Sequence, residues 1–211
     1  AFLIHRHPVV AVAVIDLIAE RLAQSAEVIA QMRDDPGLRS QIARVAELGV
    51  RTLNSGGKVL FAGNGGSAAD SQHLAGELVS RFGFDRPGLP AVALSTDTSV
   101  LTAIANDYGY EAVFARQIEA LARPGDLFFA ISTSGNSPNI VNALKMCRDL
   151  AITTVGLTGL GGGTMGDYCD HCLRVPHHQT PRIQEGHILI GHLICELIER
   201  SIFADTASEV E

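Results

Sequence analysis

The sequence lacks the features that mark several common protein classes. It has four cysteines (Cys147, Cys169, Cys172 and Cys195) in 211 residues. That is too few for a disulfide scaffold, so we expect a reducing, cytoplasmic environment. It has no cluster of Lys and Arg, and its formal net charge is −7. This argues against nucleic acid or an anionic membrane as the main partner. It also lacks a continuous apolar run of about eighteen residues, so we expect no transmembrane helix.

The length and the hydrophobic content predict a single domain. A chain of 211 residues with 46% hydrophobic residues can bury a substantial core. The apolar stretch over residues 1–15 superficially resembles a secretory signal, but Pro8 interrupts it and Asp16 ends it. We expect a helix, or sequence left over from cloning, in its place. We assign N-terminal helices to residues 1–57, an α/β core to 58–178 and a C-terminal helix to 179–211.

Apolar spacing predicts an α/β fold with a doubly wound parallel sheet. Two helices, over residues 9–33 and 38–54, look like an N-terminal helical pair separated by Asp34-Asp-Pro-Gly37. Five short apolar runs follow, over residues 59–62, 91–94, 127–131, 153–157 and 172–175. Their hydrophobicity is continuous rather than alternating, which is typical of parallel strands covered on both faces. A long helix over residues 181–203 ends the pattern, with Pro181 in its first turn.

Two loops rich in Gly and Ser follow the first and third predicted strands, at residues 63–69 and 132–137. Ligands of open α/β sheets bind beyond the carboxyl ends of the strands. Both loops precede helices, whose first N–H groups can hold a phosphate together with short hydroxyls. Such residues also serve as plain turns and caps, but two loops at equivalent positions favour a phosphate. Neither loop has the dinucleotide fingerprint or the lysine of a P-loop, so we expect a phosphorylated small molecule.

Four polar side chains on two predicted helices suggest a metal site. His73 and Glu77 are four residues apart and therefore share one face of a helix. Gln184 and His192 lie about 80° apart around the last helix, near enough to converge on one point. Two helices can thus supply four ligands.

Other residues compete with this set. His187 lies about 60° from Gln184 and Glu185 lies about 20° from His192, so spacing alone leaves these alternatives open. A second metal motif is Cys169-Asp-His-Cys172, with His177 and His178 behind it. It lacks the second, suitably spaced pair of a zinc ribbon, and small core cysteines are the commoner explanation.

The motifs together resemble a known family. Asn64-Gly-Gly-Ser67, Ser132-Thr-Ser-Gly-Asn-Ser137, and the combination of His73 and Glu77 with Gln184 and His192 resemble the phosphoheptose isomerase (sedoheptulose 7-phosphate isomerase) family of the sugar isomerase, or SIS, fold. The resemblance covers residues 10–203, and the conjunction of motifs is far more specific than any one of them. It implies a flavodoxin-like three-layer sandwich, a homotetramer with active sites at subunit interfaces, and one Zn²⁺ per subunit.

The resemblance also implies roles for individual residues. The implied zinc ligands are His73, Glu77, Gln184 and His192. The implied substrate contacts are Asn64, Gly65, Gly66, Ser67, Glu77, Arg81, Asn106, Asp107, Ser132, Thr133, Ser134, Ser137 and Gln184. One departure is Pro181, which stands where some relatives have an acidic residue.

The implied activity is the conversion of D-sedoheptulose 7-phosphate to D-glycero-D-manno-heptose 7-phosphate through an enediol, an early step towards nucleotide-activated heptose for lipopolysaccharide or capsule. Moving a proton between neighbouring carbons needs a base, an acid and an electrophile. The candidate base is Glu77, the candidate acid is His192, and Zn²⁺ is the candidate electrophile. The roles are in tension, because a carboxylate bound to zinc is a weaker base than a free one.

Three alternatives remain at this stage. A noncatalytic SIS-fold adaptor that binds a replication initiator protein typically lacks the equivalents of Glu77 and His192, and both are present here. A sugar-phosphate sensor needs the loops but no paired carboxylate and imidazole. An isomerase of another sugar phosphate shares the same site.

Overall fold

Five parallel strands form the centre of the computed structural model, which describes residues 11–203. The strands are β1 (Val59–Gly63), β2 (Ala91–Ala93), β3 (Leu127–Ile131), β4 (Thr153–Gly159) and β5 (His171–Val175), in the order β2-β1-β3-β4-β5. This is the flavodoxin-like order, and it confirms the predicted fold class. The expectations for residues 1–10 lie outside the described residues.

The continuous apolar runs predict the central strands best. Every residue of β1 and β3 is buried. The prediction of burial has to be corrected for the edge strand β2. Val92 is exposed, whereas the sequence predicts a strand covered on both faces. An edge strand has a neighbour on one side only, and this one borders an open apolar groove between the helices α4 (Thr98–Tyr108) and α5 (Val113–Leu121).

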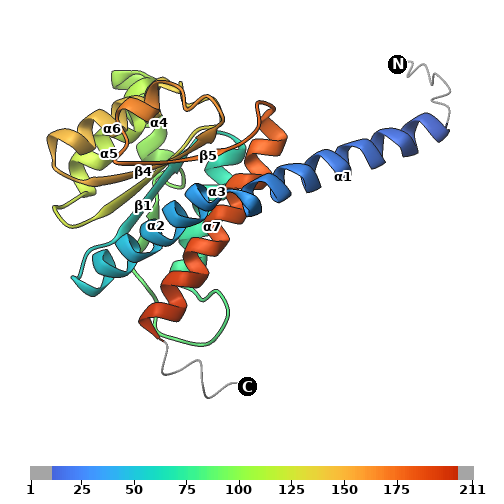
Figure 1. Ribbon diagram of the computed structural model, residues 1–211. Coiled ribbons are helices and arrows are strands. Elements are labelled where there is room, and N and C mark those ends of the chain that lie inside the picture. The colour runs from blue at the N-terminus through green and yellow to red at the C-terminus, as the bar shows by residue number, and fades with distance from the viewer. Residues whose placement is uncertain (1–10, 204–211) are drawn as a thin grey trace.

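Helices cover both faces of the sheet (Figure 1). On one face, the helices α2 (Pro36–Asn54), α3 (Gly66–Val79) and α7 (Thr180–Ile202) share a core with Phe61 and Phe129, whose rings stack at 5.0 Å. On the other face, α5 and α6 (Pro138–Asp149) pack on Leu60 and Phe128, with α4 partly buried beside them. The alternation of side chains along each strand divides the core into these two layers. The described residues also include two short 3₁₀ helices, η1 (Tyr110–Ala112) and η2 (Thr164–Asp167).

The second helix begins two residues before the predicted start. Asp35 precedes it, and its carboxylate accepts hydrogen bonds from the N–H groups of Gly37 and Leu38. Pro36 occupies the first turn, where its missing N–H costs nothing. The Asp-Pro-Gly sequence is therefore a helix start as well as a break.

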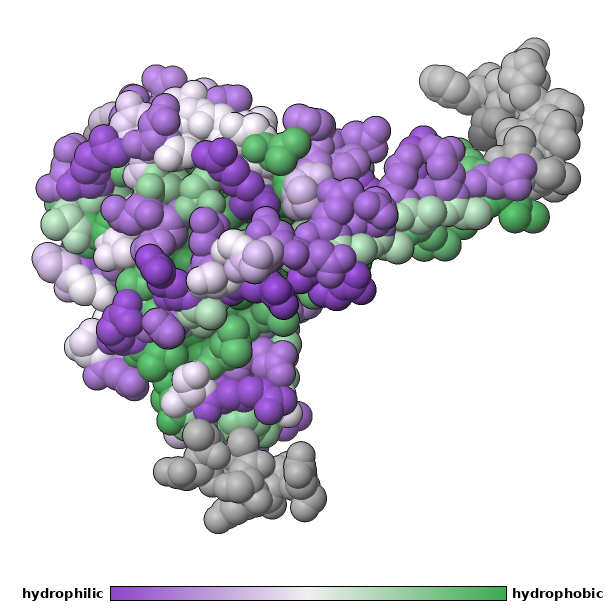
Figure 2. All heavy atoms as spheres, viewed as in Figure 1, coloured by the Kyte–Doolittle hydropathy of each residue, from purple (hydrophilic) through white to green (hydrophobic). Residues whose placement is uncertain are grey.

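The predicted N-terminal helical pair is present, and its first member is the helix α1 (Ala11–Asp34). It projects away from the body of the molecule (Figures 1 and 2), and only its last turns are buried, at Val28 and Met32. Its outer turns expose large apolar side chains at Ile15, Ile18 and Leu22. A hydrogen bond also joins α1 to α7. The guanidinium of Arg182 donates to the carbonyl of Arg21 at 2.9 Å.

Within residues 11–203, no helix is both long enough and apolar enough to cross a bilayer.

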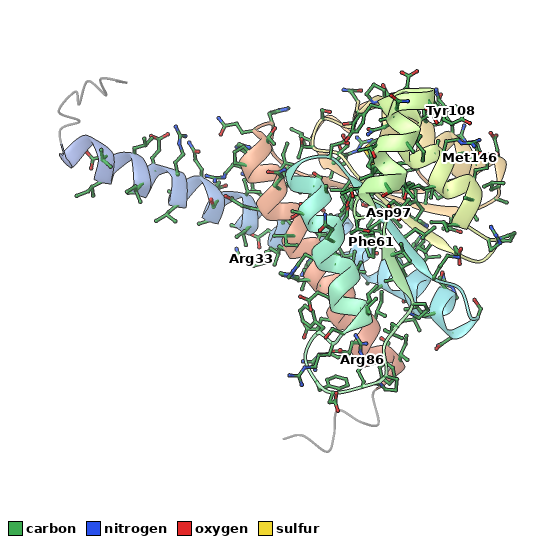
Figure 3. The ribbon with its side chains drawn as sticks, turned by 180° about the vertical axis from the view of Figure 1, so that it is seen from behind. Arg33, Phe61, Arg86, Asp97, Tyr108 and Met146 are labelled. Carbon is green, nitrogen blue, oxygen red and sulfur yellow. The ribbon has the colours of Figure 1, made fainter. Side chains whose placement is uncertain are left out.

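A buried ion pair joins the end of α7 to the loop after α3. Glu199 and Arg86 lie 2.9 Å apart, and both are almost fully buried (Figure 3 labels Arg86). Glu199 also accepts from the N–H groups of Phe82 and Gly83, at 2.8 and 2.6 Å. Arg86 donates to the carbonyl of Glu77 at 2.9 Å and to three further carbonyls. The network thus holds the last turn of α3 against α7.

Hydrogen bonding decides the charge of Glu199. Burial alone would raise the pKa of this carboxyl, but the bonds from Phe82, Gly83 and Arg86 outweigh it and lower the pKa below its usual value. The stability that this depressed pKa contributes is therefore present above the unfolded-state pKa and is lost as the pH falls through the folded-state value.

We expect Glu199→Gln to destabilise the fold by about 3–5 kcal/mol, because it leaves the guanidinium of Arg86 buried without a counter-charge. Urea denaturation measures the free energy of unfolding. The matched control is Glu196→Gln on the same helix, whose pair with Arg200 is exposed. It should change stability by about 0.5 kcal/mol or less. Equal effects of the two substitutions would contradict the assigned role of the buried pair.

Candidate active site

The two Gly/Ser loops lie side by side, because β1 and β3 are neighbours in the sheet. The order of the strands reverses between them, and such a switch point is where open α/β sheets bind ligands. In the first loop, Gly65 has a φ of +55°, which favours glycine. In the second, the hydroxyls of Ser132 and Ser137 lie 3.0 Å apart, and Ser137 precedes α6. The loops therefore direct the first N–H groups of α3 and α6 towards one region.

A reciprocal pair of amides ties the loops together. Asn64 donates to Asn139 at 2.9 Å, and Asn139 donates back to Asn64 at 2.8 Å. The phenol of Tyr110, in η1, donates to the same Asn64 oxygen at 3.0 Å. Asn139 and Tyr110 are absent from the predicted site. Asn139 directly follows Ser137-Pro138 at the start of a predicted helix, so it could have been considered, but nothing in the sequence indicates Tyr110.

Two imidazoles and a carboxylate meet where α3 passes α7. The Nε2 atoms of His73 and His192 lie 2.8 Å apart, and Nε2 of His73 lies 3.1 Å from Oε1 of Glu77. Within the described residues, these three form the one group of three or more His, Cys, Asp or Glu ligand atoms within 4.8 Å of one another. The His192 ring also packs on Phe82, with centroids 5.8 Å apart.

Glycine allows the two helices to come this close. A Cβ at Gly191 would lie 2.5 Å from Cδ2 of Leu74, which is itself buried. His73 is the residue before Leu74, and His192 is the residue after Gly191. The tight contact in the core therefore sets the separation of the two imidazoles at the surface.

The structure gives different surroundings to the four residues of α7 that compete as metal ligands, which are Gln184, Glu185, His187 and His192. His187 is fully buried, and burial lowers its pKa to about 4, so it is a neutral core residue near pH 7. Glu185 pairs with Arg182. The amide of Gln184 lies against Gly66 at the start of α3, so that a Cβ on this glycine would run into it. Gln184 is therefore placed at the first loop, and its part as a fourth metal ligand stays a prediction.

The remaining predicted contacts lie further out. Arg81 is exposed in the loop that follows α3. Asn106 and Asp107 are exposed at the end of α4, where the Asn106 amide donates to the Asp107 carboxylate at 2.8 Å. Within the described part of the chain, none of these three side chains forms a hydrogen bond with the two loops or with the imidazole pair. Tyr110, three residues beyond Asp107, does reach Asn64.

One carboxyl near the imidazoles was missed by the sequence analysis. Asp70 lies one turn before His73 on α3, and burial raises its pKa, although the nearby His73 opposes this shift. Its position three residues before His73 is the signal that could have found it.

Among the described residues, Cys169 and Cys172 belong to no group of three or more His, Cys, Asp or Glu ligand atoms. The sulfur of Cys169 lies against Gly156 of β4, and burial raises the pKa of its thiol well above the usual range. It is a partly buried residue that packs against the core.

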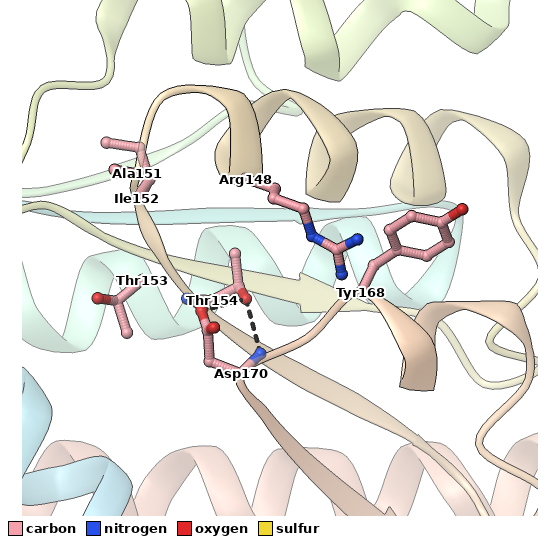
Figure 4. Close-up of a pocket in the computed structure, with 7 residues that line it drawn as sticks. All are labelled: Arg148, Ala151, Ile152, Thr153, Thr154, Tyr168 and Asp170. Carbon is pink, nitrogen blue, oxygen red and sulfur yellow. Dashed lines mark hydrogen bonds between the residues drawn. The ribbon is translucent and has the colours of Figure 1, made fainter.

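A further pocket lies at the opposite end of the sheet, at the amino ends of β4 and β5 (Figure 4). Its volume is about 240 Å³, and none of the predicted site residues lines it. The Asp170 carboxylate is already bound by the N–H and the hydroxyl of Thr154, each at 2.8 Å.

The fold and the paired loops define the class of the protein. Residues 17–159 match the SIS domain family. The solved phosphoheptose isomerase structure from Francisella tularensis superposes with a TM-score of 0.85 at 37% identity, over 88% of this chain and 98% of that one. The corresponding structure from Neisseria gonorrhoeae gives 0.82 at 42% identity, with the same coverage. The protein is thus a SIS-domain protein.

Curated relatives narrow the class to one family. The chain is 55% identical over 188 residues to the phosphoheptose isomerase of Aneurinibacillus thermoaerophilus, covering 89% of this chain and 95% of that protein. The chain belongs to the phosphoheptose isomerase family, and the resemblance drawn from its motifs is confirmed.

We expect Gly191→Ala to weaken the fold and the imidazole pair together. The new methyl overpacks against Leu74, which typically costs about 1–3 kcal/mol, and moves His192 away from His73. Thermal unfolding and zinc titration measure the two effects. The control is Gly76→Ala on α3, where an added Cβ meets nothing within 4 Å. If zinc binds Gly191→Ala as tightly as it binds the unaltered chain, this helix contact does not set the imidazole geometry.

Proposed function

We propose that the protein interconverts D-sedoheptulose 7-phosphate and D-glycero-D-manno-heptose 7-phosphate. The observation that carries the proposal is the cluster of His73, Glu77 and His192 in a chain whose two phosphate-type loops meet at the sheet's switch point. An adaptor or a sensor has no need of this carboxylate and imidazole pair. Family membership at 55% identity supports the same reading.

The phosphate is bound by the loops rather than by a cationic cluster. The backbone N–H groups of Gly65 and Gly66, the side chain of Ser67 and the hydroxyls of the second loop are the donors. The positive ends of the α3 and α6 dipoles add to this binding. Further contacts in the proposed site come from Asn64, Arg81, Asn106, Asp107, Ser132, Thr133, Ser134, Ser137 and Gln184.

The imidazole and carboxylate cluster suits a zinc ion. Two ligand nitrogens on a tetrahedral Zn²⁺ lie about 3.3 Å apart, given Zn–N bonds of about 2.0–2.1 Å. The separations of 2.8 and 3.1 Å in the cluster lie within about half an ångström of this value. His73, Glu77 and His192, with Gln184 as a proposed fourth ligand, would hold one ion per subunit. When bound, the ion would act as a Lewis acid on the substrate's carbonyl and hydroxyl oxygens.

Glu77 and His192 carry the proton transfers. The Glu77 carboxylate takes the proton from C1 of the ketose, which forms the enediol, and returns it to C2. His192 gives a proton to the oxygen on C2 and accepts one from the oxygen on C1, so that C1 becomes the aldehyde. Glu77 needs a free oxygen for this step, because a fully metal-bound carboxylate is a poor base.

The proposed assembly is a homotetramer with active sites between subunits. The apolar side chains on the outer turns of α1 support association with further copies, since single chains rarely expose a contiguous apolar helix face to water. A cytoplasmic location and a place in nucleotide-heptose synthesis for lipopolysaccharide or capsule complete the proposal.

The catalytic roles predict strong effects of near-isosteric substitutions. Glu77→Gln and His192→Gln should each lower kcat about 100-fold or more, because each removes a proton-transfer group. Conversion of sedoheptulose 7-phosphate measures the effect. Glu196→Gln, one turn beyond His192 on α7, should retain full activity. Full activity in both site variants would rule out the proposed pair.

Metal removal provides an independent prediction. We expect about one zinc per subunit in the purified protein, and dialysis against a chelator should abolish activity and lower Tm. Both should recover when Zn²⁺ is restored, because a ligand at about 100 times its Kd stabilises the fold by about 2.7 kcal/mol. His73→Ala should bind zinc much more weakly. Full activity in a metal-free sample would disprove the zinc role.

A further inference from the structure

A cavity of about 330 Å³ opens beside the second loop, and part of its wall is formed by residues that are not among the proposed substrate contacts. It is lined by Asn64, Tyr110, Glu111, Ser137, Pro138 and Asn139. Asn64 and Ser137 belong to the two loops at the switch point, whereas Tyr110 and Glu111 come from η1, on the opposite side. The chemistry of this second wall differs from that of the loops.

The amide of Asn64 is almost fully engaged. A carboxamide has two N–H donors and one oxygen with two lone pairs. The Asn64 oxygen accepts from Tyr110 and from Asn139, and its nitrogen donates one hydrogen to Asn139. This orientation is fixed by three bonds and leaves a single N–H of Asn64 for a ligand.

The bond to Asn64 also decides what Tyr110 can offer. The phenol has one hydrogen, which it donates to the Asn64 oxygen at 3.0 Å. Towards the cavity, Tyr110 can therefore only accept a hydrogen bond. The neighbouring Glu111 carboxylate is likewise an acceptor when ionised, and it carries a negative charge. A phosphate dianion has no hydrogen to donate and would be repelled by Glu111, whereas a sugar hydroxyl can donate to either group.

We infer that Tyr110 and Glu111 form a subsite for the hydroxyl-bearing chain of the substrate, and so set the direction in which the sugar phosphate lies. The phosphate faces the N–H groups and hydroxyls of the loops, and a sugar hydroxyl donates to the phenol oxygen of Tyr110. This inference rests on the proposed function, because it takes a sugar phosphate as the ligand of the site.

Tyr110→Phe removes the hydroxyl and keeps the ring, and folding is not at risk because the side chain is 58% exposed. One neutral hydrogen bond corresponds to about a two- to tenfold change in affinity. We expect KM for sedoheptulose 7-phosphate to rise by that factor and kcat to stay within about twofold, because Tyr110 takes no part in proton transfer. The control is Tyr108→Phe, which is similarly exposed at 59% and whose ring lies under Arg116. Its hydroxyl makes no hydrogen bond within residues 11–203.

Calorimetric titration separates this inference from the proposed activity. Tyr110→Phe should weaken sedoheptulose 7-phosphate by about two- to tenfold and leave the Kd of inorganic phosphate unchanged. Equal weakening of both ligands would place Tyr110 at the phosphate end and overturn the inference, and so would unchanged binding of the sugar phosphate. If the unaltered protein binds the sugar phosphate with this pattern but does not isomerise it, the proposed activity fails while the subsite stands.

Discussion

The close passage of α3 and α7 is the constraint on which the site depends. Leu74 fills the space that a side chain at position 191 would occupy, so the helix axes approach further than two ordinary apolar residues would allow. The residues next to this contact are His73 and His192, whose nitrogens come within 2.8 Å. A small apolar contact in the core thus assembles a polar cluster near the surface, and groups 119 residues apart in the chain become neighbours.

The ends of the same two helices are joined a second time by the pair of Arg86 and Glu199. Arg86 binds the carbonyl of Glu77, and Glu199 binds the N–H of Phe82, whose ring packs on His192. One buried network therefore contacts the surroundings of both proposed catalytic groups. The buried charges are stabilised because Glu199 accepts three hydrogen bonds and Arg86 donates to four backbone carbonyls.

Much of the fold could be predicted because its signals are local. The central strands need long apolar side chains on both faces, so they appear as continuous runs, and β1 and β3 agree with prediction to within one residue. The loops at residues 63–69 and 132–137 were predictable because neighbouring parallel strands bring their carboxyl ends together. The direction of α1 could not be predicted, because the sequence pattern of its apolar face would be the same whether the helix packed on α2 or projected outwards.

The sequence by itself determined the α/β class, the positions of both phosphate-type loops, and the family through its combined motifs. Only the tertiary structure separated His192 from His187 and Glu185. Around this helix Glu185 lies about 20° from His192 and His187 lies about 60° from Gln184. Burial and partners depend on what packs against each face. It also placed the Tyr110 hydroxyl against Asn64, although the two residues are 46 positions apart in the chain. Local spacing encodes which way a side chain points along its own helix, whereas its environment comes from other elements of the fold.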